Sequence, residues 1–242
     1  MGYPYRRQLL EEDLYELMDM LVQRKPNELV YNPYRIVKKP FVDTTTQYHN
    51  KLTYLKYLFY KEAKILLLGE AGGYNGLKHS GIAFTSTKIL KKHRLFREIR
   101  KDIDYDFKIY TENSATIVYG FFEKNPKLFS KCVLFNTFPF HPHNTGELET
   151  NRTPSKEEIE EGKKYILQLF KVFDFKEAHG IGKIAFNCLK ELRENNDIPD
   201  ITISKIRHPS YGGKNEFIEN LNQIFEIKTD KIEFKNMEDY FR

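Results

Sequence analysis

The sequence has no tryptophan and only two cysteines, Cys132 and Cys188, among 242 residues. Two thiols cannot build a disulfide framework, an iron–sulfur cluster with four thiolate ligands or a Cys-rich zinc site. Long apolar runs are also missing, since stretches such as 65–68 and 132–135 fall far short of the roughly 18 residues that a membrane span requires. The start MGYPYRRQ is not followed by an apolar signal core. These absences predict a soluble, unexported protein of a reducing compartment, the cytoplasm.

The composition is that of an ordinary globular protein, with 40% hydrophobic and 30% charged residues, 13 Gly and 10 Pro. No low-complexity tract or repeat of 20 to 50 residues is present, which argues against solenoids. The 39 Lys and Arg exceed the 34 Asp and Glu, giving a net charge of +5. This mild excess is compatible with a polyanionic partner and equally with solubility alone.

Apolar spacing predicts helices at 8–24 and 45–63, joined by a basic, Pro-punctuated connector at 26–40. Beyond them, strands and helices alternate. The predicted strands are 64–68, 132–135, 178–181 and 201–206, and the predicted helices are 115–124, 156–173, 183–194 and 215–225. This alternation is typical of βαβ units, and it predicts an α/β fold: a three-layer α/β/α sandwich around a short, mainly parallel sheet. Residues 1–45 are expected to form a helical extension and 46–242 the α/β domain.

Polar, Gly- or Pro-rich segments follow three of the predicted strands, at 69–76, 136–143 and 207–213. Because open α/β sheets bind ligands at the carboxyl ends of their strands, these segments are expected to converge on one crevice.

Neither standard phosphate-binding glycine motif is present in the first of these loops. A looser match, GIGKIA at 180–185, leaves open a nucleotide- or cofactor-using enzyme as an alternative. His141 and His143 lack a neighbouring carboxylate or Cys, so no metal site is predicted there. No cofactor is expected.

Six segments, in order along the chain, together resemble the uracil-DNA glycosylase superfamily over about residues 50–225. They are GEAGGYNG from Gly69, GIAFTS from Gly81, ENSATIVY from Glu112, FNTFPFHPH from Phe135, NRTPSKEEI from Asn151 and RHPS from Arg207. The first is most similar to the branch whose motif reads GEAPG. That branch holds an iron–sulfur cluster, for which this chain lacks the thiols.

The resemblance implies a monofunctional DNA glycosylase, which flips a pyrimidine, most simply uracil, out of DNA and leaves an abasic site. It assigns His208 as the catalytic donor to the base oxygen, Asn136 as the reader of the base edge and Phe84 as the ring on which the base stacks. No Lys in the three loops suggests a Schiff base, so strand cleavage is not expected.

The position of the water-activating residue differs from that in the best-known members of the family. They carry Asp where this chain has Ala71. Glu70 is the nearest carboxylate and is the first catalytic candidate, while Asn75 is a second residue that could position the water. Because the Asp is absent, a non-catalytic DNA-binding protein on the same scaffold is an alternative.

Specificity in many uracil-specific relatives depends on a bulky side chain against the pyrimidine 5-position. The corresponding positions here are Gly73 and Tyr74, which line the expected base pocket together with Ala71. Either Tyr74 takes over the gate, or the pocket admits a 5-modified pyrimidine, such as the glucosylated hydroxymethylcytosine of phage DNA. The second alternative implies a role in antiviral defence rather than repair.

The expected partner is DNA, bound by a monomer. Ser210 and the following loop 211–214 are predicted to contact it, with Tyr211 as a wedge in the vacated base stack. The backbone at Gly212 and Gly213 and the side chains of Lys214 and Arg152 are predicted to meet phosphates.

Overall fold

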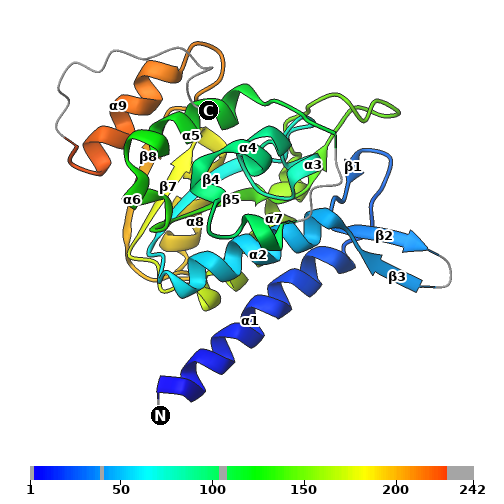
Figure 1. The fold of residues 1–242 in the computed structure, drawn as a ribbon, viewed down its shortest axis with the longest axis horizontal. Helices are drawn as coiled ribbons and strands as arrows, with labels where there is room; N and C mark the ends of the chain where they lie inside the picture. Colours follow the sequence, from blue (N-terminus) through cyan, green and yellow to red (C-terminus); the bar gives the residue numbers. More distant parts are fainter. Residues whose placement is uncertain (1–2, 39–40, 104–107, 228–242) are drawn as a thin grey trace.

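The fold is built around a sheet of four parallel strands, as seen in the computed structural model, which describes residues 3–38, 41–103 and 108–227 (Figure 1). The strand order is β5 (Cys132–Phe138), β4 (Ile65–Ala71), β7 (Glu177–Ile181) and β8 (Thr202–Ile206). β4 and β5 end three residues later than predicted, because their pairing continues through Gly69 with Asn136 and Ala71 with Phe138. Glu70 and Asn136 therefore lie on strands rather than in loops.

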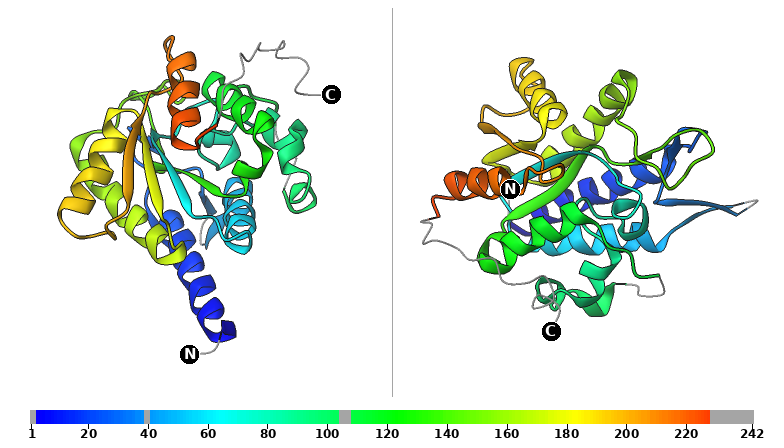
Figure 2. Two further views of the ribbon diagram at one scale, coloured as in Figure 1. Left: turned by 90° about the vertical axis from the view of Figure 1, so that its left-hand side faces the viewer. Right: turned by 90° about the horizontal axis from the view of Figure 1, so that it is seen from above.

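Helices cover both faces of this sheet. α7 (Lys156–Val172) and α8 (Lys183–Glu194) lie on one face, while α2 (Thr46–Tyr60) and α5 (Asn113–Lys124) lie on the other (Figure 2). α9 (Lys214–Ile224) contacts β8 at the edge of the sheet. The three-layer α/β/α prediction is confirmed.

Several short elements connect the larger ones between β4 and β5. They are α3 (Leu77–Ser80), α4 (Thr87–Lys92), α6 (Pro126–Phe129) and the 3₁₀ helices η1 (Arg94–Phe96) and η2 (Arg100–Asp102). Elements of three to six residues span less than two helical turns, so they carry no readable periodicity.

The prediction that 26–40 is only a connector is wrong, because two strands lie within this segment. β2 (Arg35–Lys38) pairs antiparallel with β3 (Phe41–Thr44), and β1 (Val30–Tyr31) pairs antiparallel with β6 (His141–Pro142). β1 is only two residues long and its partner lies more than a hundred residues away, so the prolines dominate the local pattern. Residues 39 and 40 of the predicted connector lie outside the described residues.

α1 (Tyr3–Gln23) packs on the main domain, against α7 and α2. Leu14, Leu17, Met18 and Leu21 are fully buried and belong to the same hydrophobic core as the central strands. The division at residue 45 stays a prediction, but the described part of the extension contributes to the common core.

Both cysteines are buried in this core. Burial raises the pKa of the Cys132 thiol well above its usual range and that of Cys188 to about 12. Within the described ranges, no helix has the length and apolar character needed to cross a membrane.

Candidate functional site

A pocket of about 460 Å³ lies at the carboxyl ends of the four strands. The ends of β4 and β5 and the segments that follow β7 and β8 all contribute to its walls, as the positions of the three polar loops predicted. Nine predicted site residues line it: Glu70, Ala71, Gly73, Phe84, Asn136, Arg152, His208, Ser210 and Tyr211. The other five, Tyr74, Asn75, Gly212, Gly213 and Lys214, are next to these in sequence but are not among the lining residues that the structure describes.

Asn136 and Phe84 form one end of the pocket, directly above Gly69. A Cβ atom at Gly69 would lie 2.5 Å from both the Asn136 Oδ1 and the edge of the Phe84 ring, so only glycine allows this approach. Phe84 has a left-handed backbone with φ of 52°, which is rare for an aromatic residue and is typical of functional sites. Asn136 is 2% exposed, and its side-chain amide makes no hydrogen bond to any residue that the structure describes. The amide therefore remains free to pair with a ligand.

His208 lies beside Phe84, with 6.0 Å between the ring centroids. The Ser210 backbone N–H donates to its Nδ1 at 3.2 Å, so Nδ1 must be unprotonated. Burial, and then the charge of Arg207, lower the pKa of His208 below 6.5, which keeps the ring neutral at pH 7. The remaining proton therefore sits on Nε2, and His208 presents a neutral N–H donor.

Glu70 is a half-buried carboxyl group in the pocket wall. Burial raises the pKa of Glu70, and the Thr153 hydroxyl, which favours the ionised form, only partly opposes this effect. The neighbouring Ala71 pairs with Phe138 and offers no functional group. The catalytic role of Glu70 stays a prediction.

Tyr74 and Asn75 continue the loop beyond Gly73. The Tyr74 backbone N–H donates to Asn151 Oδ1 at 2.9 Å, which fixes the loop against the segment before α7. Roles for Tyr74 as a gate and Asn75 in positioning water stay predictions.

The loop after β8 presents an aromatic side chain outward. Tyr211 is 100% exposed, and it and Gly212 both have left-handed backbones, with φ of 53° and 77°. Gly213 then caps α9, which starts at Lys214. The role of Tyr211 as a wedge and the DNA contacts of the loop stay predictions.

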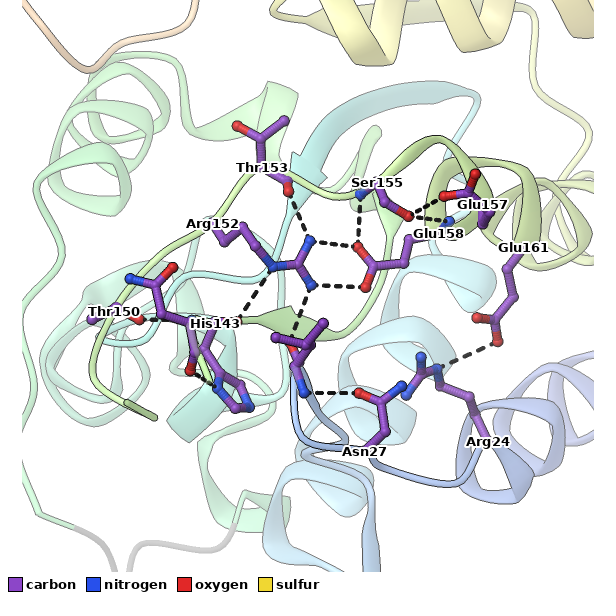
Figure 3. A network of polar contacts seen from close by, with 12 residues as sticks. Arg24, Asn27, His143, Thr150, Arg152, Thr153, Ser155, Glu157, Glu158 and Glu161 are labelled. Atoms are coloured by element: carbon purple, nitrogen blue, oxygen red, sulfur yellow. Dashed lines mark hydrogen bonds and ion pairs between the residues drawn. The ribbon is translucent and has the colours of Figure 1, made fainter. Parts of the chain in front are cut away.

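Arg152 has structural partners that the sequence did not indicate (Figure 3). Its guanidinium donates to both Glu158 carboxylate oxygens, at 2.8 and 2.9 Å, and to the backbone carbonyls of Leu29, His143 and Thr153. Glu158 also closes a capping box with Ser155 at the start of α7. The side chain therefore joins three segments of the chain, and a phosphate contact by Arg152 stays a prediction.

Several lining residues were not predicted as site residues, among them Glu112, Asn151, Thr153 and Lys183. Glu112 and Asn151 begin two of the resembling segments, ENSATIVY and NRTPSKEEI, and that position was the available signal. Lys183 follows Gly182 in GIGKIA, so this motif forms part of the same pocket rather than a separate site.

His141 and His143 are engaged with the backbone. The His141 ring nitrogens lie 2.9 and 3.0 Å from the carbonyl oxygens of Gly72 and Leu148, and His143 Nδ1 lies 2.8 Å from that of Asn144. In the part of the chain that the structure describes, His, Cys, Asp and Glu form no group of three or more that could hold a metal ion.

A larger hollow of about 990 Å³ lies between α1 and α7. Its charged side chains have both signs, and it contains none of the strand-end residues. The predicted site residues lie in the smaller pocket.

The fold and this pocket define an α/β/α protein with a ligand site at the carboxyl ends of parallel strands. No family model matches the chain, and no curated protein matches it. Among solved structures, wild-type SMUG2 of Pedobacter heparinus is similar, with a TM-score of 0.60 and 18% sequence identity. The match covers 88% of this chain and 97% of the SMUG2 chain. At this identity the two proteins share a fold.

Proposed function

We propose that this protein is a monofunctional DNA glycosylase, which hydrolyses the N-glycosidic bond of a pyrimidine nucleotide flipped out of DNA. The observation that carries the proposal is the placement of His208, whose Nδ1 accepts the Ser210 N–H, in one pocket with Phe84 and Asn136. The fold shared with SMUG2, a member of the uracil-DNA glycosylase superfamily, supports the same reading. Assignment to the GEAPG branch stays a prediction.

The three residues have complementary tasks. Phe84 stacks on the base, and the Asn136 amide pairs one donor and one acceptor with the base edge. As the C1′–N1 bond breaks, negative charge develops on the base oxygens, and the His208 Nε2–H stabilises it without transferring its proton. A preorganised donor of this kind lowers the barrier by about 3 kcal/mol.

Uracil is the simplest substrate, and a 5-modified pyrimidine is the second candidate. Gly72 and Gly73 line the pocket without side chains, so no side chain from these two residues narrows it. The Glu112 carboxylate lies beside Gly73 instead, 2.9 Å from the position of a Cβ atom there. A base enlarged at the 5-position, as in modified phage DNA, is the second substrate that the assay below tests.

The test is an alkali-cleavage assay on labelled oligonucleotides, each carrying one base: uracil, thymine, cytosine, hydroxymethylcytosine or glucosylated hydroxymethylcytosine. His208→Ala should lower the single-turnover rate on the cleaved base by about 100-fold or more, and Asn136→Ala should also reduce it. His49→Ala, at an exposed histidine outside the pocket, serves as the matched control. Cleavage of no base, with DNA binding retained, would replace the proposal with a non-catalytic DNA-binding role.

A further inference from the structure

Glu112 is a carboxylate of the pocket that the proposed function does not yet use. It is the N-cap residue of α5, where its side chain makes no capping hydrogen bond. Instead it lines the pocket, opposite the loop that follows β4. This position brings a second carboxyl group, besides Glu70, to the same site.

The loop after β4 is shaped around the Glu112 carboxylate. A Cβ atom at Gly73 would lie 2.9 Å from its Oε1, and one at Gly76 would overlap its Oε2. Side chains at both positions would therefore displace the carboxylate. The absence of side chains at these two glycines therefore allows the Glu112 carboxylate to pack against the loop.

One oxygen of this carboxylate has no hydrogen-bond partner within the described ranges. Oε2 is buried and makes no hydrogen bond to any residue that the structure describes. Burial raises the pKa of Glu112, although the Ser114 hydroxyl favours the ionised form. A buried carboxylate oxygen without a partner is unfavourable, and such groups in native proteins call for an explanation in function or in bound water.

Asn151, like Glu112, lies close to Gly73. Its Oδ1 is 3.8 Å from the position of a Gly73 Cβ atom. Because this Oδ1 accepts the Tyr74 backbone N–H at 2.9 Å, the orientation of the amide is fixed. Its Nδ2 group is a donor without a partner among the described residues. A carboxylate acceptor and an amide donor thus flank one glycine of the pocket.

We propose that Glu112 and Asn151 hold the water that attacks the sugar. This assignment rests on the proposed glycosylase function. The water donates one hydrogen bond to Glu112 and accepts one from Asn151 Nδ2. Its oxygen forms the new bond to C1′, the C1′–N1 bond breaks with its electron pair leaving on the base, and the water proton passes to the Glu112 carboxylate. His208 stabilises the departing anion.

Glu70 is less suited to this task. Both carboxyl groups have a hydroxyl partner, Thr153 for Glu70 and Ser114 for Glu112. Among the described residues, however, a buried oxygen without a hydrogen-bond partner is found on Glu112 and not on Glu70. Glu70 therefore provides the comparison within the same pocket.

The experiment measures single-turnover cleavage of the base that the wild-type enzyme removes, by Glu112→Gln, Asn151→Ala and Glu70→Gln. Glu149→Gln, at an exposed carboxylate outside the pocket, is the matched control. Glu112→Gln should lower the rate at least 100-fold and Asn151→Ala about 10-fold. Both should bind an abasic-site oligonucleotide within threefold of the wild type, which shows that the pocket is still folded.

The possible outcomes separate the two proposals. If the wild type cleaves and Glu112→Gln retains its rate, or if only Glu70→Gln abolishes it, the water assignment is wrong and the glycosylase function stands. If Glu112→Gln loses binding in parallel with rate, Glu112 maintains the loop rather than the water, and the assignment again fails. A wild type inactive on every base overturns both proposals.

Discussion

Two aromatic residues of the pocket, Phe84 and Tyr211, have backbones in the left-handed region, with φ of 52° and 53°. This conformation costs about 1–3 kcal/mol for a residue with a bulky side chain, and it persists only where the surroundings enforce it. The two rings have opposite exposures, since Phe84 is 8% exposed and Tyr211 100%. Strain at the site is therefore concentrated at the residue proposed to support the base and at the one predicted to fill its place in DNA.

At His208 the lowered pKa makes stability depend on pH. Between pH 6.5 and its lowered pKa, the unfolded chain binds a proton at this residue that the folded chain does not, so acidification favours unfolding. We expect the wild type to lose stability relative to His208→Gln when the pH falls from 7.5 to 5.5. The difference between their free energies of unfolding should change by at most about 1.4 kcal/mol per pH unit.

Denaturant titrations of both proteins at the two pH values measure this difference. The other histidines are common to both proteins, so their contributions cancel. A difference that does not change with pH would show that His208 is protonated as readily in the folded state as in the unfolded chain.

At the scale of an element, the start of α7 depends on Arg152. The Arg152–Glu158 pair lowers the pKa of Glu158 despite partial burial, and the Ser155 backbone N–H contributes to the same effect. Below the pKa of Glu158 in the folded state, this contribution to stability is lost.

Arg152→Ala should therefore lower the free energy of unfolding by about 1–2 kcal/mol at pH 7, because it removes a bidentate ion pair and three contacts to backbone carbonyls. Arg152→Lys should recover only part of the loss, since a lysine cannot bind both carboxylate oxygens in a fork. Thermal unfolding at a series of pH values from 7 down to 3 checks this, and the deficit of Arg152→Ala should become smaller as the pH falls through the lowered pKa of Glu158.

The salt dependence of DNA binding distinguishes this structural role from a phosphate contact. The relevant quantity is the slope of the logarithm of the binding constant against the logarithm of the salt concentration. A phosphate contact by Arg152 would reduce the slope by about one in the alanine variant. An unchanged slope in a destabilised variant would leave Arg152 with the structural role alone.

The sequence predicted some elements better than others for physical reasons. α8 begins and ends where predicted, because its apolar residues recur at helical spacing and Gly182 precedes it. β1 was not predicted, because a two-residue strand is defined by its distant partner, β6, and not by any local pattern.

At the scale of the whole molecule, α1 contributes to the common core. We expect Leu17→Ala to lower the free energy of unfolding of the full chain by about 2–5 kcal/mol, because the side chain is fully buried in that core. Glu12→Ala, at an exposed position of the same helix, should change it by less than about 0.5 kcal/mol.

Denaturant unfolding of both variants, followed by far-ultraviolet circular dichroism, tests this expectation. A single transition with the lower midpoint for Leu17→Ala would show that α1 unfolds together with the sheet. A separate early transition, with the main one unchanged, would instead support the independent extension predicted at 1–45.

Part of the candidate site could be predicted from the sequence, because it depends on the strand order of the whole sheet and not on local contacts. His208 and Asn136 stand at or just beyond strand ends, and parallel strands bring their carboxyl ends together whatever the details of the connections. Glu112 and Lys183 reach the pocket from the starts of α5 and α8. Their places depend on how each crossover packs on the sheet, which no local pattern specifies.

The full exposure of Tyr211 has a calorimetric consequence. A partner that covers this ring removes apolar surface from water, and such burial gives a negative change in heat capacity. Contacts between cationic side chains and phosphates bury little apolar surface. The temperature dependence of the binding enthalpy therefore reports whether the ring enters the base stack or stays in solvent beside the DNA.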